Sequence, residues 1–160
     1  YGENDRWQAI IETNLTGTYQ LVEEALPYFA SKEDGYRHVV IISSILARLG
    51  VPRYTAYCAS KAGLLGLMRS WSVELAAQNI LVNAIAPGWV STDMATEGLE
   101  TFAKSAGKSY EEIYQEQMSH VLLGKMSEPE EIGEMIAYLL SQTSITGQTL
   151  DINNGAIMPA

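Results

Sequence analysis

The sequence predicts an α/β fold built around a parallel sheet, and three observations support that class. A continuous apolar run at residues 39–42 and a second, mostly apolar run at 80–86 are typical of strands buried on both faces of a sheet. In the segments before and between them, apolar residues recur at three- and four-residue steps, which indicates amphipathic helices. Two serines follow the first run at 43–44, and a segment that begins with a strand-breaking Pro-Gly pair follows the second at 87–92. Open α/β sheets bind ligands at the carboxyl ends of their strands. We therefore expect a candidate site at that edge.

Composition indicates one domain over residues 1–160 and argues against several functional classes. With 160 residues, 47% of them apolar and 18% charged, the chain can bury one core. Its net charge of -9 argues against a basic surface for nucleic acid or an anionic membrane. The single cysteine, Cys58, excludes an internal disulfide framework. Because no apolar run reaches the ~20 residues that span a bilayer and no signal pattern opens the chain, we expect a cytoplasmic protein.

The first predicted helix lies near the N-terminus, and Asp5 is placed to cap it. Its stripe at helical spacing consists of Trp7, Ile11, Asn14, Thr18, Val22, Ala25 and Phe29. A polar loop at 31–36 leads into the strand at 39–42. The next helix continues to about Gln78, and Asn79 ends it before the second strand.

Three more features are expected after the strand at 80–86. Residues 93–125 are the least regular stretch and contain a predicted helix at 110–120. Another helix begins with Ser127 as its cap and Pro129 in its first turn, and it runs to about Leu140. A third strand is predicted at 148–152.

The candidate chemistry lies in Ser44, Tyr57 and Lys61. Ser44 ends a buried strand, and Tyr57 and Lys61 are four residues apart, so they share one helix face. A free tyrosine titrates near pKa ~10, and a nearby cation favours its phenolate, as general acid–base catalysis requires. A serine hydroxyl beside it can hydrogen-bond the substrate oxygen. The alternative is an ordinary exposed pair on a helix beside a turn serine.

These residues, with Asn14 in NLTG, Pro87-Gly88 in NAIAPGWVST, and ITGQTLDINNG, resemble the short-chain dehydrogenase/reductase family. The resemblance is to its short single-domain subgroup, which includes 3-oxoacyl carrier protein reductases. It implies an NAD(P)-binding Rossmann-like doubly wound parallel sheet, of which the C-terminal half is present, with about three strands and four helices. The family's glycine-rich T-G-x-x-x-G-x-G turn is absent. Its usual aspartate and two glycines are replaced by Asn153-Asn154-Gly155.

The resemblance implies an NAD(P)-dependent oxidoreductase that interconverts a carbonyl and a secondary alcohol. Ser44 would orient the oxygen, Tyr57 would exchange the proton, and Lys61 would lower the pKa of Tyr57 and bind the nicotinamide ribose. Asn14 would hold a water in the proton relay. The expected cofactor contacts are Tyr57, Lys61, Pro87, Gly88, Val90 and Thr92, and the expected substrate contacts are Ser44, Ile45, Tyr57 and Met94. Residues 93–125 would form a mobile lid over the substrate.

The resemblance also implies partners. The small residues Ala59, Gly63 and Gly66 would let this helix pair with its copy in a homodimer or homotetramer. About a hundred residues would precede this chain in a complete member, so the strand at 39–42 would form a bare apolar edge that needs the N-terminal half. The missing half also carries the selector between NAD and NADP, so either cofactor is possible.

Two alternatives stay open at this point. The chain could be a truncated, catalytically inactive dimerisation module, or it could belong to a dehydratase or epimerase variant of the family. No metal site is predicted, because His38 and His120 are isolated from other histidines at ligand spacing.

Overall fold

The computed structural model describes residues 6–158, and it contains a parallel sheet of three strands. The strands lie in the order β1-β2-β3, with bounds Arg37–Ile42, Ile80–Pro87 and Thr149–Ile152. The register of the first pair runs from Arg37 opposite Ile80 to Ile42 opposite Ile85. All pairs are parallel, so the carboxyl ends of the strands meet at one edge. The predicted α/β class is confirmed.

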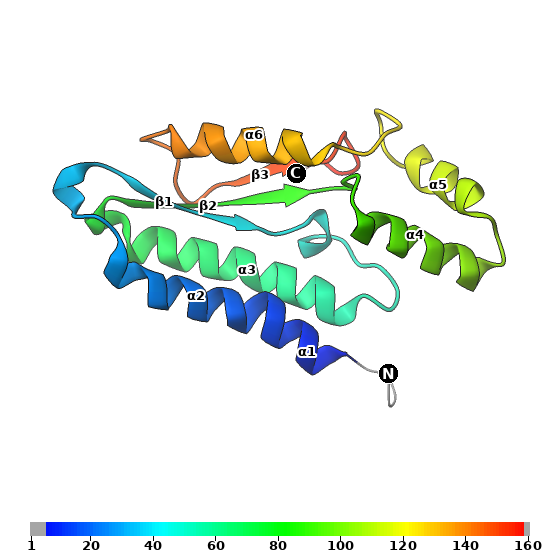
Figure 1. The fold of residues 1–160 in the computed structure, drawn as a ribbon, viewed down its shortest axis with the longest axis horizontal. Coiled ribbons are helices and arrows are strands. Elements are labelled where there is room, and N and C mark those ends of the chain that lie inside the picture. Colours follow the sequence, from blue (N-terminus) through cyan, green and yellow to red (C-terminus); the bar gives the residue numbers. More distant parts are fainter. Residues whose placement is uncertain (1–5, 159–160) are drawn as a thin grey trace.

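Helices cover both faces of this sheet (Figure 1). One face carries α3 (Thr55–Glu74) and, beneath it, the N-terminal helix formed by α1 (Trp7–Ile11), a π-helical turn (Glu12–Thr16) and α2 (Gly17–Ala25). The other face carries α6 (Pro129–Leu140). A strand, a crossover helix and a parallel strand recur along the chain, which is the connectivity that buries a parallel sheet on both sides.

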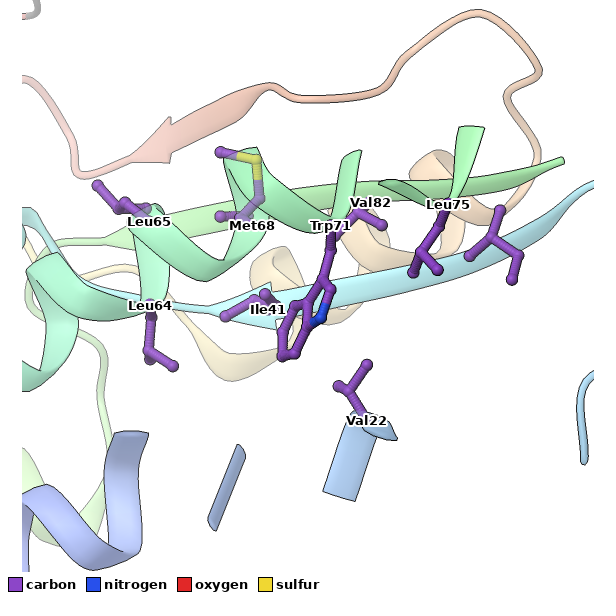
Figure 2. Packing of buried hydrophobic residues seen from close by; sticks show 10 residues of the cluster. Val22, Ile41, Leu64, Leu65, Met68, Trp71, Leu75 and Val82 are labelled. Atoms are coloured by element: carbon purple, nitrogen blue, oxygen red, sulfur yellow. The ribbon is translucent and has the colours of Figure 1, made fainter. Parts of the chain in front are cut away.

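The larger core lies between α3 and the sheet (Figure 2). Residues of α3 at three- and four-residue steps point into it, and they are Leu64, Met68, Trp71 and the following Leu75. Trp71 also stacks on Tyr19 at 6.1 Å between ring centroids, and its Nε1 donates to Glu23 Oε1 at 3.0 Å. The core therefore fixes the N-terminal helix, α3 and the sheet relative to one another.

Gly63 serves this packing within the chain. A Cβ added there would lie 2.8 Å from Leu15 Cδ2, so the glycine lets α3 approach the N-terminal helix closely. A Cβ added at Gly66 would meet nothing within 4 Å. Both glycines were expected to face a second subunit. Gly63 is instead explained by packing within the chain, whereas a side chain at Gly66 would enter open space.

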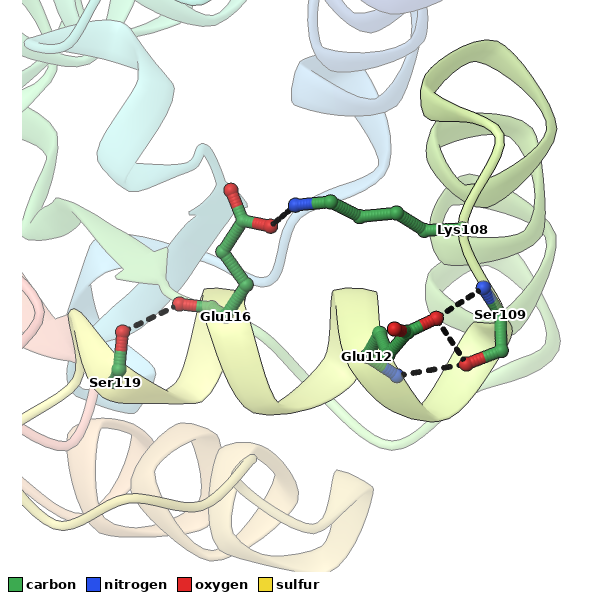
Figure 3. A network of polar contacts seen from close by, with 5 residues as sticks. All are labelled: Lys108, Ser109, Glu112, Glu116 and Ser119. Atoms are coloured by element: carbon green, nitrogen blue, oxygen red, sulfur yellow. Dashed lines mark hydrogen bonds and ion pairs between the residues drawn. The ribbon is translucent and has the colours of Figure 1, made fainter.

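The region 93–125 contains two helices, α4 (Asp93–Ala106) and α5 (Tyr110–Ser119), at the carboxyl end of the sheet (Figure 1). They pack on each other through a small cluster of Leu99, Ala103 and Ile113. Figure 3 shows the start of α5, where Ser109 and Glu112 form a capping box. Lys108, just before the helix, forms an ion pair with Glu116, which lies one turn beyond Glu112. The sequence predicted only the second of these helices, at 110–120, and placed its C-terminal end one residue too late.

Several other predicted boundaries are corrected. Ser127 is not the cap of α6: Glu128 is the N-cap and forms a capping box with Glu131, while Ser127 is buried. Helix α3 ends at Glu74, and a 3₁₀ turn follows before Asn79, whose φ of 55° is left-handed. The third strand begins at Thr149, one residue later than predicted. The expected cap Asp5 lies outside the described residues.

Strand β1 is an edge of the sheet within residues 6–158, because its recorded neighbour is β2 alone. Beside it lies an open groove of ≈ 470 Å³ between β1 and the N-terminal helix. Apolar side chains such as Leu21, Val22 and Phe29 line this groove, and His38 and Asn14 also reach it. The predicted bare edge is therefore present in the described part of the chain. None of the helices in that part has the length and hydropathy to cross a membrane.

Candidate active site

Ser44 is held rigidly where β1 ends. The preceding Ser43 extends the sheet by donating its backbone N–H to Ile85 O at 2.8 Å, and its hydroxyl donates to Lys61 O at 2.9 Å. Ser44 itself has an extended backbone and caps a 3₁₀ turn, Ile45–Ala47, by accepting from Leu46 N at 3.1 Å. The strand end is thereby bonded to both β2 and α3, and the Ser44 hydroxyl has a fixed position.

Tyr57 and Lys61 lie on one face of α3, one turn apart, as their spacing predicts. The Lys61 Nζ stands 5.5 Å from the centroid of the Tyr57 ring and donates to Ile42 O, the last carbonyl of β1, at 2.9 Å. The Tyr57 phenol is within hydrogen-bonding reach of Ser44. The three predicted groups therefore come together at the carboxyl end of β1.

Burial dominates the electrostatics of this cluster. It raises the pKa of Tyr57, and the hydrogen bond with Ser44 opposes this rise only in part. Burial also lowers the pKa of Lys61, because the ammonium loses hydration. The phenol of Tyr57, whose pKa is raised, therefore keeps its proton at neutral pH, and the effect of Lys61 on that pKa stays a prediction.

Asn14 lies in the π-helical turn, where Gly17 N donates to Glu12 O five residues back. Its Nδ2 donates to Ser60 Oγ at 3.2 Å, and Ser60 Oγ donates to Tyr57 O at 2.8 Å. The amide thus bonds the hydroxyl of a side chain on α3. Ser60 is fully buried (0% exposed), so this two-bond link fixes the turn of α3 that carries Tyr57 to the N-terminal helix.

The predicted cofactor loop begins where β2 ends at Pro87. Gly88 N donates to Ile152 O at 2.9 Å, and a Cβ added at Gly88 would lie 2.9 Å from Asn153 Cβ, so this position has room for glycine only. Further along, Val90 forms a parallel bridge with Ser127, and the Thr92 side chain caps α4. The loop is thus fixed at the same edge of the sheet as Ser44.

The two remaining predicted substrate residues differ in their surroundings. Ile45 directly follows Ser44 and is buried. Met94 lies in the first turn of α4 with 74% of its surface exposed. The geometry therefore places Ile45 beside the cluster, and Met94 on an open part of α4.

Sequence reasoning missed Tyr54, which precedes Tyr57 by one helical turn. Its ring lies 6.2 Å from the Tyr57 ring in an edge-to-face arrangement and 5.8 Å from Phe102 of α4. These contacts connect the cluster to the 93–125 region. No spacing rule marks a lone tyrosine before a helix, so the sequence carried no signal for it.

A second missed contact is the ion pair between Arg48 and Asp151. Arg48 Nη1 lies 2.9 and 2.7 Å from the two carboxylate oxygens of Asp151. The pair ties the turn after Ser44 to β3 across more than a hundred residues of sequence. No sequence pattern indicates that two charged residues so far apart in the chain form an ion pair.

Known proteins resemble this chain along nearly its whole length. A family model described as "Enoyl-(Acyl carrier protein) reductase" matches residues 2–156. A 3-oxoacyl-[acyl-carrier-protein] reductase FabG of Thermotoga maritima is 35% identical over 98% of this chain and 59% of its own. The Haemophilus influenzae protein of the same name is 37% identical over 96% of this chain and 59% of its own. The chain thus spans somewhat more than half the length of these relatives.

Solved structures agree with these matches. The F189W variant of actinorhodin polyketide ketoreductase, crystallised with NADPH, superposes with a TM-score of 0.88 at 34% identity. The superposition covers 96% of this chain and 59% of that one. A short chain dehydrogenase family protein from Francisella tularensis gives 0.80 at 24% identity, which supports the fold alone. By these matches the chain belongs to the short-chain dehydrogenase/reductase family, in which the two relatives above are named 3-oxoacyl-[acyl-carrier-protein] reductases.

Proposed function

We propose that this chain is the catalytic part of an NAD(P)-dependent oxidoreductase that interconverts a carbonyl group and a secondary alcohol. The observation that carries the proposal is the meeting of Ser44, Tyr57 and Lys61 at the carboxyl end of β1. A phenol, an ammonium and a hydroxyl in one place can bind a carbonyl oxygen and supply its proton. The names of the relatives favour a 3-oxoacyl thioester as the substrate class.

The residues at this edge suit the nicotinamide end of the cofactor. Lys61 Nζ uses one of its three N–H donors on Ile42 O, which leaves donors for ribose hydroxyls. Tyr57 would share the ribose, and the carboxamide would lie against Pro87, Gly88, Val90 and Thr92. When bound, the nicotinamide cofactor gives or takes the hydride. The sequence lacks the glycine-rich turn that would hold a pyrophosphate, so the choice between NAD and NADP stays open.

The chain's own groups account for proton transfer and orientation. Ser44 donates a hydrogen bond to the substrate oxygen and fixes its distance from Tyr57. Tyr57, whose pKa is raised by burial, enters the reduction protonated and gives its proton to that oxygen. The positive charge of Lys61 stabilises the phenolate that is left. Asn14 holds the Tyr57 turn through Ser60 and keeps the water of the proton relay.

Residues 93–125 act in this proposal as a lid over the substrate. The ring of Phe102 on α4 contacts Tyr54, which in turn contacts Tyr57. A movement of α4 and α5 would therefore shift the surroundings of Tyr57. A second copy of the chain is the proposed partner, through the exposed side of α3 at Gly66 and Val73.

A second candidate function is an inactive dimerising module. Residues 1–160 by themselves offer groups for the nicotinamide end alone, and a few hydrogen bonds there, each worth about 0.5–1.5 kcal/mol, do not offset the ordering of a whole dinucleotide. Calorimetric titration of the 160-residue chain with NADH and NADPH tests this point. We expect very weak binding, and micromolar binding would show a cofactor site that lies elsewhere.

Activity is tested in a chimera in which residues 1–160 replace the matching region of the Thermotoga maritima reductase. The Tyr57→Phe change removes only the proton-carrying oxygen, so reduction of a 3-oxoacyl thioester should fall by about 10²–10⁴-fold. Tyr54→Phe is the matched control, because it removes a neighbouring phenol oxygen and should keep most of the turnover. Equal rates for the Tyr57 variant and the parent would refute the assignment of Tyr57. A chimera that folds and binds cofactor without turnover would favour the inactive module.

A further inference from the structure

The turn after β3 differs from the usual pattern of the family at Asn153-Asn154-Gly155. Asn154 has a φ of 53°, in the left-handed region that glycine adopts freely and asparagine tolerates. The usual glycine would serve the backbone at this position without strain. The asparagine side chain therefore adds something that the conformation itself does not require.

That addition is a set of hydrogen bonds to the end of the 93–125 segment. Asn154 Nδ2 donates to Lys125 O at 3.2 Å and to Ser127 Oγ at 3.0 Å. The backbone oxygen of Asn154 accepts from Leu123 N at 3.1 Å. Ser127 is nearly inaccessible (1% exposed), so its bond to Asn154 is shielded from water.

The backbone of Ser127 is also hydrogen-bonded to the loop that follows β2. Its N–H donates to Trp89 O at 2.9 Å, and its carbonyl accepts from Ser91 N at 2.9 Å. Trp89 and Ser91 alternate with the proposed cofactor contacts Gly88, Val90 and Thr92. A continuous set of hydrogen bonds thus joins the C-terminal turn, the end of the lid and the cofactor loop.

The neighbouring packing points the same way. A Cβ added at Gly155 would lie 2.8 Å from Leu122 Cβ, so Leu122 closes over this glycine just before the bonded stretch. The C-terminal end of the lid is therefore seated on the turn by contact at Leu122 and by hydrogen bonds from Leu123 to Ser127.

We propose that Asn154 is a positioning residue that anchors the C-terminal end of the lid and couples it to the cofactor loop through Ser127. Its role in the reaction rests on the proposed function. The anchor itself is a property of the chain. Removing the side chain should free residues 123–127 while leaving the sheet intact, so the complete enzyme should bind substrate less well and keep most of its chemical rate.

Asn154→Gly is the decisive variant, because glycine keeps the left-handed backbone and removes only the side-chain bonds. Asn79→Gly is the matched control. Asn79 has a φ of 55°, and its Nδ2 also donates to a backbone carbonyl, Lys32 O, at 3.2 Å. The control therefore loses a similar bond from a similar backbone, in the turn before β2 rather than beside the lid.

The measurement is residue-resolved amide hydrogen exchange on the 160-residue chain. For Asn154→Gly we expect exchange at Leu123, Ser127 and Ser91 to become faster by about tenfold or more, from the loss of two hydrogen bonds. Amides in the centre of β2 should keep their protection. Asn79→Gly should leave the three amides as in the parent. Unchanged exchange at Leu123 and Ser127 in Asn154→Gly would overturn the anchor, and unchanged exchange at Ser91 alone would overturn the coupling.

The chimera gives the second readout. Asn154→Gly should raise KM for the 3-oxoacyl substrate severalfold with kcat largely retained, whereas Asn79→Gly should change neither. A purely structural role would lower the folded fraction in both variants alike and leave KM unchanged, which would overturn the proposal. Exchange is read without any turnover, so a failure of the proposed function and a failure of the anchor can be told apart.

Discussion

Gly63 and Gly66 lie three residues apart in α3 and allow the packing of that helix to be tested by one substitution at two sites. A methyl group added at Gly63 would stand 2.8 and 3.0 Å from the two terminal carbons of Leu15. Both distances are shorter than ordinary carbon contacts, so Leu15 has to move. A methyl group at Gly66 would enter open space.

The expected magnitudes follow from two opposing effects. Replacing glycine by alanine inside a helix gains about 1 kcal/mol of folding free energy at either site. Gly66→Ala should therefore stabilise the chain by roughly 0.5–1 kcal/mol. At Gly63 overpacking costs about 1–3 kcal/mol, so the net effect should lie between neutrality and a loss of about 2 kcal/mol. For a chain of this size each kcal/mol shifts Tm by about 2–4 °C.

The assay is urea and thermal unfolding followed by circular dichroism, with Leu15→Ala as the companion change. In the Leu15→Ala background the obstruction is gone, so Gly63→Ala should become as favourable as Gly66→Ala. Equal stability of the two single glycine variants would refute the packing argument. The value for Gly66→Ala applies to the monomer at low concentration, and a loss of stability that appears only at higher concentration would support the proposed contact of this glycine with a second subunit.

Three further predictions concern the candidate site. Because burial lowers the pKa of Lys61, the folded chain gains stability as pH rises from that lowered pKa toward about 10.5. Lys61→Met should therefore be more stable than the parent at pH 7 and lack this rise, which urea unfolding at pH 7, 9 and 10 would show; an identical pH dependence in both proteins would contradict it. Ser60→Ala should cost about 0.5–1.5 kcal/mol of folding free energy, because it removes the hydrogen bond from the half-buried amide of Asn14, and no measurable loss on denaturation would argue against the link. A double-mutant cycle on Arg48 and Asp151 should give a coupling free energy of about 0.2–1 kcal/mol that becomes smaller in 1 M salt. Zero coupling at low salt would show that the ion pair does not contribute to stability.

The strands were predictable because their signal is local and strong. The run at 39–42 is apolar throughout and the run at 80–86 is apolar except for Asn83, as is typical of strands covered on both faces, and both runs lie inside observed strands. Strand β1 starts earlier than predicted, at Arg37, because β2 extends alongside and pairs with Arg37 and His38. These two polar residues gave no strand signal in the sequence. The meeting of Ser44, Tyr57 and Lys61 was predictable from the sheet edge and the helix spacing.

What could not be predicted depends on contacts between distant segments. Helix α4 was missed because only one of its three buried residues, Leu99, is a large apolar side chain, while Ala95 and Ala103 are small, and because it packs on α5 and not on the main core. Ser127 looked like a helix cap, as serine before Glu-Pro usually does, but Asn154 and the β2 loop occupy its hydrogen bonds. The direction of the Tyr57 pKa shift also required the structure, since it depends on how much water the fold excludes.

The π-helical turn at Asn14 has a consequence for how this helix can change by mutation. A turn closed five residues back, from Gly17 N to Glu12 O, holds one residue more than an α-helical turn. Such a turn is what results when a single residue is inserted into an ordinary helix without unfolding its ends. Deleting one residue between Glu12 and Thr16 would reverse that insertion and restore an α-helical turn, with Trp7–Ile11 and α2 keeping the faces that they present now. The position of Asn14 beside Ser60 thus depends on the number of residues in this turn as well as on the identity of the residue.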